Sequence, residues 1–381
     1  MVNLSNNIAG MITNPTVPPI VVRAVRCVGV ELPMTYALGT SRGTLTKAPL
    51  LLIDLETDQG ITGRSYLWCY FPAAMAAIAK VMDEVERVTT GAPLAPVELW
   101  GRLAERFALI GVQGVVRMAM AGFDIAAWDA LAIAAGLPLA RLLGSETKPI
   151  PAYNSCGLGL MKSGDEVADE AEKLLIRGFR AVKLRLGYPS LQQDLAVLRA
   201  VRKRIGTAVA LMVDYNQALD HPEARVRGGA LDEEDIYWLE EPIRHDDYAG
   251  CATLARELKT PIQIGENFSE STAMAVALSA GAADYVMPDL ERIGGVTGWQ
   301  RAAGLAAIHR IRMSSHLYPE VSAHLLAATS TCHFLEYVDW ADAILDASLE
   351  IVDGCAVIPD QPGNGLPGMT RRWSAIGCDG A

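Results

Sequence analysis

Three acidic residues recur at equal spacing, and each ends a short apolar segment. Asp214, Glu240 and Glu266 are separated by 26 positions, and they close the segments ALMVD, IYWLE and IQIGE. Carboxylates that converge from successive parallel strands repel one another unless a cation neutralises them. Because a set of ligands made only of oxygen suits a hard divalent ion, the pattern predicts a Mg²⁺ site.

Two cations share one predicted strand with apolar neighbours. Lys183 and Arg185 in AVKLRLG are two positions apart, so the alternation of a strand places both side chains on one face, toward the mouth of a barrel. Charges that alternate on an exposed strand are the competing interpretation. The apolar residues between and beside them, such as Val182 and Leu184, disfavour it because that opposite face must be covered by helices.

A histidine and an aspartate end two neighbouring predicted strands. Asp289 closes YVMPD and His316 closes IRMSSH, so the carboxylate can accept a hydrogen bond from one imidazole nitrogen and leave the other free. That arrangement predicts an oriented general base. We expect structural roles for the remaining histidines, which are His221, His245, His309, His324 and His333.

A further acid, Glu336, ends the segment HFLE. Near other carboxylates it is expected to be protonated and to donate a hydrogen bond to a substrate oxygen. A metal, a cation, an acid and an oriented base together suit one reaction class, the removal of a proton from the carbon next to a carboxylate, because the resulting enediolate carries charge on two oxygens.

The spacing of apolar segments predicts the elements that position these side chains. Eight strand ends follow one another at intervals of 22 to 31 positions, as expected for a (β/α)8 barrel over residues 148–356 with its chemistry at the carboxyl ends of the strands. Residues 21–63 are strand-like, with a hairpin turn at Asp-Gln-Gly, and residues 72–136 are helical, which predicts an N-terminal α+β capping domain over residues 1–147. Residues 357–381 are expected to pack back on this domain.

Composition limits the possible partners. The chain has 381 residues, of which 51% are hydrophobic and 20% charged, so it can bury a large core. A net charge of −11 disfavours binding to nucleic acid or to an anionic membrane. The apolar stretch 116–135 contains three charged residues, which favours a core helix over a membrane span. Scattered cysteines and the lack of a signal-peptide pattern favour the cytoplasm.

Longer motifs resemble a known family along nearly the whole chain. APLLLIDLET, GFDIAAWDAL, GFRAVKLRLGYP, MVDYNQALD, WLEEP, MPDLERIGGVTGW and MSSHLYPEVSAHLLAAT resemble the enolase superfamily, in particular its mandelate racemase subgroup (the mandelate racemase/muconate lactonizing enzyme family), with mandelate racemase itself as a close match. The resemblance implies a capping domain on a modified barrel, one Mg²⁺ per subunit, a small 2-hydroxy carboxylate as substrate, and a homo-oligomer, octameric or smaller.

The resemblance also implies roles for particular residues. Asp214, Glu240 and Glu266 are implied to hold the metal, and the choice of Glu240 over Glu241 rests on the resemblance alone. Asp289 with His316 is implied to be the base dyad, and Lys183 the cation at the substrate carboxylate. Glu336 is implied to be the acid that supports the enediolate, and Asn216 and Ser155 to be accessory polar contacts.

Two departures leave the outcome of the reaction open. Where mandelate racemases carry a second lysine as the base for the opposite face, this chain has Arg185, which holds its proton at physiological pH. A racemase or epimerase is the first expectation, and a one-base dehydratase of an acid sugar or hydroxy diacid is the alternative. Leu38, Leu45 and Val338 predict an apolar pocket, whereas Arg42 predicts a polar far end of the substrate or else points to solvent.

Two further alternatives belong to other classes of protein. In a non-catalytic scaffold the barrel would persist without chemistry, but burying five metal and dyad groups costs stability unless function needs them. A zinc hydrolase is disfavoured because no His-x-His pair occurs in the sequence.

Overall fold

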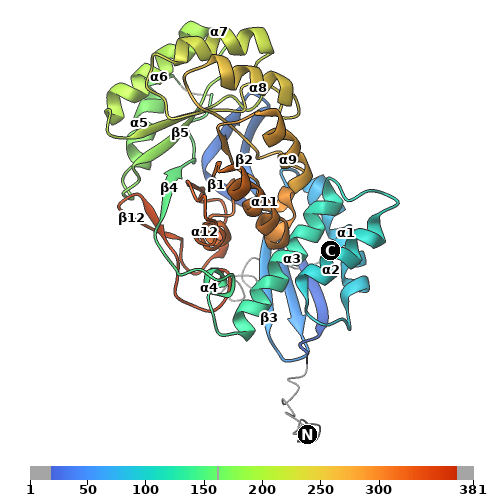
Figure 1. The fold of residues 1–381 in the computed structure, drawn as a ribbon. Helices are drawn as coiled ribbons and strands as arrows, with labels where there is room; N and C mark the ends of the chain where they lie inside the picture. Colours follow the sequence, from blue (N-terminus) through green and yellow to red (C-terminus); the bar gives the residue numbers. More distant parts are fainter. Residues whose placement is uncertain (1–18, 161–162, 367–381) are drawn as a thin grey trace, which may run out of the picture.

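The computed structural model describes residues 19–160 and 163–366, which form a capping unit and a barrel (Figure 1). The capping unit begins with an antiparallel sheet in the order β1-β2-β3, with β1 at Val22–Thr40, β2 at Gly43–Thr57 and β3 at Thr62–Trp68. The predicted hairpin turn between β2 and β3 is confirmed, and its Gly60 adopts a φ of 75°, which favours glycine.

Three helices cover one face of this sheet: α1 at Pro72–Thr89, α2 at Pro96–Phe107 and α3 at Val115–Ala134. α3 is buried on most of its surface because it packs on β3 on one side and on barrel helix α11 on the other. Gly63 permits this close packing, since a Cβ atom there would lie 2.0 Å from the carbonyl oxygen of Ala126. The expected core helix is therefore confirmed, and none of the described helices is long and apolar enough to cross a membrane.

Eight parallel strands form the barrel. Each strand from β4 to β9 pairs with the next in chain order, and β11 pairs with β4. Between β10 and β11 the ring is completed by hydrogen bonds from His333 N to Met313 O and from Ser315 N to Phe334 O, both 3.0 Å. The strands are β4 at Ile150–Asn154, β5 at Ala181–Arg185, β6 at Ala210–Asp214, β7 at Leu239–Glu240, β8 at Ile262–Ile264, β9 at Tyr285–Val286, β10 at Arg312–Met313 and β11 at Leu335–Tyr337.

Helices alternate with these strands on the outside of the barrel. Two of them start with a capping box, in which Ser163 pairs with Glu166 and Ser190 pairs with Gln193. The helices are α5 at Gly164–Leu174, α6 at Leu191–Ile205, α7 at His221–Leu231, α8 at Tyr248–Glu257, α9 at Ser271–Ala280, α10 at Leu290–Ile293, α11 at Gly295–His309 and α12 at Pro319–Ala327.

The predicted fold class is confirmed, and the predicted strand ends lie within three positions of the observed ones. Glu266 and Asp289 follow strands of only three and two residues, so they lie in the loops just beyond β8 and β9. A late hairpin, with β12 at Glu350–Val352 and β13 at Cys355–Val357, was not predicted. It pairs with β4 on the side away from β5.

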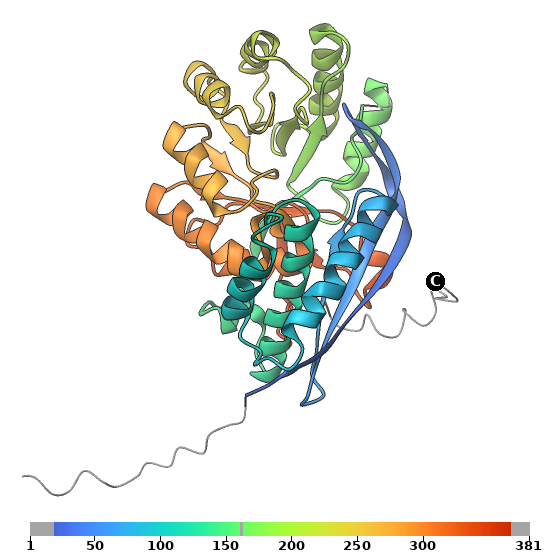
Figure 2. The ribbon, with the colours of Figure 1, turned by 90° about the vertical axis from the view of Figure 1, so that its right-hand side faces the viewer.

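The end of the described chain returns to the helices of the capping unit. The short helix α4 (Leu139–Leu142) follows the capping unit, and Leu139 N donates to Gly363 O at 2.8 Å, while Asn364 N donates to Asp129 Oδ1 of α3 at 2.7 Å. These bonds tie residues 363–364 to the capping unit, whereas residues 367–381 lie outside the described part of the chain. The long hairpin of β1 and β2 runs up beside the barrel (Figure 2).

Candidate active site

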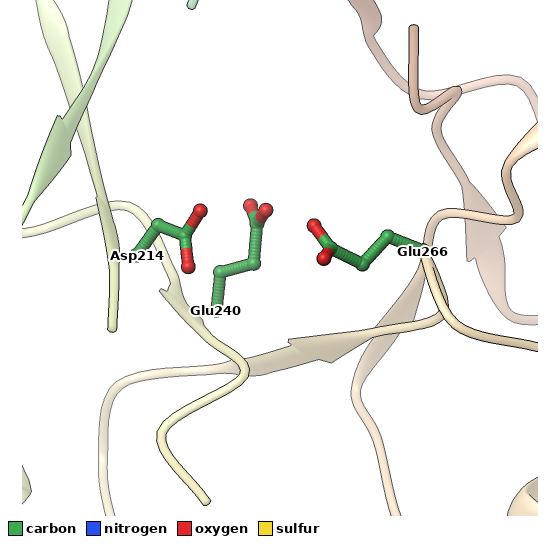
Figure 3. A group of neighbouring side chains, drawn as sticks. All are labelled: Asp214, Glu240 and Glu266. Atoms are coloured by element: carbon green, nitrogen blue, oxygen red, sulfur yellow. The ribbon is translucent and has the colours of Figure 1, made fainter. Parts of the chain in front are cut away.

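The three evenly spaced carboxylates converge at the rim of the barrel. One oxygen from each of Asp214, Glu240 and Glu266 lies within 4.8 Å of the other two, and the side chains point toward a common centre (Figure 3). Asp214 and Glu240 end neighbouring strands with paired registers, so the spacing in the sequence becomes proximity in space. The adjacent Glu241 lies outside this group and accepts two hydrogen bonds from Asn267 Nδ2.

Among the described residues, Lys183 is the ion-pair partner of both Asp214 and Glu240. Its Nζ lies 2.6 Å from Glu240 Oε1, 2.9 Å from Glu336 Oε1 and 3.4 Å from Asp214 Oδ2. All four side chains are at most 1% exposed, so their charges interact in a medium of low dielectric. Burial raises the pKa of Glu240 to about 8, although the Lys183 cation opposes the shift. The cluster therefore has an excess of acid that favours a bound cation.

His316 and Asp289 form the predicted hydrogen-bonded pair. Imidazole Nδ1 lies 2.7 Å from Asp289 Oδ2, while Asp289 Oδ1 caps α10 by accepting from the backbone amides of Glu291 and Arg292, both at 2.9 Å. Asp289 is thus fixed from two directions. The opposite nitrogen, Nε2, faces the carboxylates, 3.3 Å from Glu266 Oε2.

The charges around His316 and Glu336 shift the pKa values of both groups. Burial alone would lower the pKa of His316, but the surrounding carboxylates, with Glu336 foremost, raise it to about 9. Burial likewise opposes ionisation of Glu336, yet Lys183 and His316 outweigh it and hold the pKa of Glu336 below its usual range. The expectation that Glu336 is protonated is therefore wrong for this arrangement, because two cationic groups contact its carboxylate. Glu336 Oε2 also accepts a hydrogen bond from Leu317 N at 2.9 Å.

Arg185 lies on β5, across the barrel from His316, and its guanidinium donates to two backbone carbonyl oxygens and one side-chain hydroxyl. Nη1 donates to Gly157 O at 2.7 Å and to Ser155 O at 3.2 Å, and Nη2 donates to Ser155 Oγ at 3.2 Å. Only 4% of Arg185 is exposed, and Ser155 is fully buried. The structure therefore brings Ser155 to Arg185.

A cavity of about 410 Å³ lies between the tip of the β1–β2 hairpin and the barrel rim. Leu38, Leu45 and Arg42 line it from the hairpin, which for Arg42 is one of the two positions left open by the sequence. Arg42 donates from Nη2 to Gln217 O at 3.1 Å, which anchors the exposed hairpin tip to the loop after β6. Val338 is buried but is not among the described residues that line the cavity; Trp340 is.

Asn216 also lines the cavity, and it supports the first acid of the cluster. Its backbone N and side-chain Nδ2 donate to Asp214 at 2.7 and 2.9 Å. Asn216 adopts a φ of 45°, a left-handed conformation that asparagine tolerates well. The predicted accessory contact therefore touches a candidate metal ligand as well as the cavity.

Sequence reasoning missed a cation and a phenol in the cavity wall. Arg292 donates to Glu266 O at 3.1 Å and to Tyr70 OH at 2.7 Å, and it also contacts Asn267 Oδ1. Arg292 and Asn267 could have been found, because each lies within three positions of an acid that was singled out. Tyr70 belongs to the capping unit, and no spacing signal links it to the barrel.

Most of the chain matches two known protein-family models. Residues 22–144 match the family described as mandelate racemase / muconate lactonizing enzyme, N-terminal domain, and residues 166–367 match enolase C-terminal domain-like. The curated L-talarate/galactarate dehydratase of Salmonella typhimurium is 30% identical over 337 residues, covering 88% of this chain and 85% of that protein. D-galactarolactone cycloisomerase of Agrobacterium fabrum is also 30% identical, covering 83% and 88%.

Solved structures are similar over almost the full length. An enolase from an alphaproteobacterium (bal199) with bound magnesium has a TM-score of 0.91 and 42% identity, covering 93% of this chain and 99% of that one. An enolase from Bradyrhizobium complexed with magnesium and mandelic acid has a TM-score of 0.87 and 40% identity, covering 92% and 96%. L-talarate dehydratase from Polaromonas, complexed with Mg and L-glucarate, has a TM-score of 0.84 and 31% identity, covering 93% and 97%.

Proposed function

The chain belongs to the mandelate racemase/muconate lactonizing enzyme family of the enolase superfamily, and on this premise we propose that it is a Mg²⁺-dependent dehydratase of a hydroxy acid. Its curated relatives are dehydratases, cycloisomerases and an epimerase, so the chain is an isomerase or a lyase. The observation that carries the choice of a dehydratase is the asymmetry of the cavity, with an oriented imidazole on one side and a carbonyl-bound guanidinium on the other.

The group of Asp214, Glu240 and Glu266 fits Mg²⁺, which prefers carboxylate oxygen. When bound, the ion supplies positive charge that stabilises a developing enediolate. Magnesium in solved relatives of 42% and 40% identity supports this assignment. Lys183 is placed to neutralise the substrate carboxylate from β5, and Glu336, held between Lys183 and His316, is placed to hydrogen-bond the enediolate once a proton is available to it.

His316 is proposed to do the proton chemistry. In its neutral form, His316 takes the proton of C2 of a 2,3-dihydroxy acid at Nε2, while the Nδ1–H···Asp289 bond keeps the ring oriented. The same imidazolium then gives this proton to the C3 hydroxyl, and the C3–O bond breaks to release water. The enol that is left tautomerises to a 2-keto-3-deoxy acid. One base is sufficient for these reaction steps, and none of them requires Arg185 to transfer a proton.

An acid sugar or hydroxy diacid is the proposed substrate class. Arg42 lines the cavity beside Asn216 and Gln217, so polar groups are available for the far hydroxyl groups or a second carboxylate. The named activities of the relatives on talarate, galactarate and galactarolactone support this choice. A mandelate-like racemase is the second candidate, because the lining also contains Leu38, Leu45 and Trp340 and a 40% identical relative was crystallised with mandelic acid.

A screen of hydroxy acids with Mg²⁺ in D₂O tests the proposal, with separate readouts for deuterium at C2, inversion at C2 and 2-keto product. We expect keto acid from one stereochemical series and no inversion. Inversion without keto acid would establish the racemase instead, and the absence of both keto acid and C2 exchange with every acid would contradict both. A homo-oligomer, octameric or smaller, in the cytoplasm stays a prediction, which light scattering and cell fractionation can test.

A further inference from the structure

Two buried polar residues connect the proton-transfer pair to the capping unit. Glu291 follows Asp289 by two positions, and Tyr318 follows His316 by two positions. Their side chains meet, because the Tyr318 hydroxyl donates to Glu291 Oε2. Glu291 is 1% exposed and Tyr318 is 2% exposed, so neither group exchanges this partner for water.

The capping unit closes this junction with a backbone amide. Trp68 N, at the end of β3, donates to Glu291 Oε2 at 3.1 Å and to Tyr318 OH at 2.9 Å. The Trp68 ring lies 4.5 Å from the ring of Trp340, which lines the cavity. One residue of the cap is therefore bonded to both segments that carry the proton-transfer pair and also packs on the cavity wall.

The local backbone explains why such a junction is needed. Leu317 and Tyr318 adopt φ values of 53° and 52°, which are unfavourable for residues with a side chain, and they lie directly between His316 and α12. α10 is a helix of only four residues after Asp289. A parallel bridge between Asp289 and His316 and the hydrogen bond from His316 N to Pro288 O at 3.3 Å pair the two backbones at the proton-transfer pair. The contact between Glu291 and Tyr318 adds a side-chain link two positions further along, where this backbone pairing has ended.

We propose that Glu291 and Tyr318 are positioning residues, which hold Asp289 and His316 in the geometry for proton transfer only when β3 of the capping unit is docked. Their hydrogen bonds couple closure of the cavity to assembly of the base. Neither residue contacts the cavity, and the Asp289–His316 bond of 2.7 Å is the feature they maintain. The inference rests on the proposed function for its kinetic consequence, but not for its structural one.

Two removals and one conservative variant test this role. Tyr318→Phe and Glu291→Leu each delete the junction, whereas Glu291→Gln keeps an oxygen that can accept from Trp68 N and the Tyr318 hydroxyl. Tyr66→Phe is the matched control, because it deletes another buried hydrogen bond between β3 and the barrel, from Tyr66 OH to Glu320 Oε2 at 2.9 Å. Thermal unfolding measures how much each variant loses in stability.

The first readout is the proton NMR signal of the His316 Nδ1–H···Asp289 bond in the full-length protein, assigned by its loss in His316→Asn. We expect this downfield signal to shift or broaden in Tyr318→Phe and Glu291→Leu and to persist in Glu291→Gln and Tyr66→Phe. An unchanged signal in folded Tyr318→Phe and Glu291→Leu would overturn the inference, even if the wild-type protein exchanged no substrate hydrogen and the proposed function had failed.

The second readout is turnover of an active hydroxy acid. A displaced base costs about 10-fold to 100-fold in kcat, with KM changed much less, because ground-state binding does not use the imidazole. We expect that loss in Tyr318→Phe and Glu291→Leu and a loss of less than about 3-fold in Tyr66→Phe at a similar drop in Tm. Equal kcat values in Tyr318→Phe and Tyr66→Phe would reduce the junction to a stabilising contact and overturn the positioning role.

Discussion

The two sides of the cavity hold their basic groups in different ways. On the β5 side, Arg185 Nη1 donates to the carbonyl oxygens of Ser155 and Gly157 and Nη2 donates to Ser155 Oγ, so the position of the guanidinium is fixed by these acceptors. On the β9 and β10 side, His316 uses Nδ1 to bind Asp289 and leaves Nε2 toward the carboxylates. A base needs one nitrogen that can face the substrate and accept its proton, and of the two groups only His316 has such a nitrogen, Nε2. The difference supports the proposed one-base reaction, in which the proton leaves C2 toward the imidazole and is then delivered from the imidazole to the leaving hydroxyl.

The largest effect is expected from His316→Asn. The amide side chain keeps much of the volume but cannot accept a proton, so kcat should fall by about 10³-fold. His309→Asn is the control, because His309 is exposed at the end of α11. Turnover and C2 deuterium exchange are measured at saturating Mg²⁺, with circular dichroism to confirm folding. Retention of exchange in His316→Asn would assign the base to another residue.

Removing the shared cation on the β5 side should have the next largest effect. Lys183→Met leaves Glu240, Glu336 and Asp214 buried without their ammonium partner, which costs about 3–5 kcal/mol in the free energy of unfolding. Lys47→Met is the control, because Lys47 and Glu31 pair at 3.5 Å on the surface and contribute under about 1 kcal/mol. Urea unfolding measures both, and added Mg²⁺ should restore part of the Lys183→Met loss. Equal stability of the two variants would show that the buried acids do not depend on Lys183.

Proton binding on the imidazole side is open to direct titration. The pKa of His316 is raised to about 9, above its ordinary 6.5, so its protonated form stabilises the fold fully below about pH 6.5 and this contribution is lost as pH rises through 9. Mg²⁺ should lower the pKa of His316, since it neutralises carboxylates such as Glu266 that favour the cation. Burial lowers the pKa of His324 to about 4, which Mg²⁺ should not change. Histidine ring NMR with and without Mg²⁺ measures both pKa values. A pKa of His316 that does not change on addition of Mg²⁺ would show that the ion does not bind at these carboxylates.

Periodicity explains which parts of this site could be predicted from sequence. Asp214 and Glu240 end strands of a regular βα repeat, so equal spacing translates into adjacent positions on the rim. His316 and Asp289 were paired by the same reasoning. The charge state of Glu336 was predicted incorrectly, because it depends on Lys183 and His316, which approach from different strands. No pattern within one strand encodes that balance.

Contacts between the two units were beyond reach of the sequence for another physical reason. Trp68 ends strand β3 of an antiparallel sheet and Tyr70 follows it in the connection to α1. The periodicity of that sheet describes its own core and not the barrel residues that Trp68 and Tyr70 contact more than 200 positions later in the chain. Val338 was expected in the pocket because it follows a strand end, but the chain places Trp340 there. Strand alternation does not apply beyond Tyr337, where the three-residue strand β11 ends, so it cannot tell whether residue 338 or residue 340 faces the cavity.

Arg185→Lys should give the β5 side a group that can act as a base, as His316 does on the other side. An ammonium group can lose its proton at accessible pH, unlike a guanidinium, and its single nitrogen cannot reproduce all three hydrogen bonds to Ser155 and Gly157. We expect slow inversion or exchange at C2 from the opposite face, with turnover to keto acid reduced by less than about 10-fold. Chiral analysis in D₂O measures this, and the new exchange should survive in the double variant with His316→Asn. Opposite-face exchange already present in the wild type would remove the proposed asymmetry.

The smallest effect is expected at the mouth of the cavity, where Arg42 is exposed and bound to Gln217 O. An exposed ion pair contributes up to about 1 kcal/mol, so Arg42→Ala should raise KM for a hydroxy diacid by about two- to fivefold and leave KM for a hydroxy monoacid nearly unchanged. High salt should shrink the difference, since it screens exposed charges. Arg26→Ala is the control, because Arg26 pairs with Glu56 on the surface and does not line the described cavity. A KM increase that is equal for both acids would show that Arg42 supports the hairpin tip through Gln217 and does not recognise a second carboxylate.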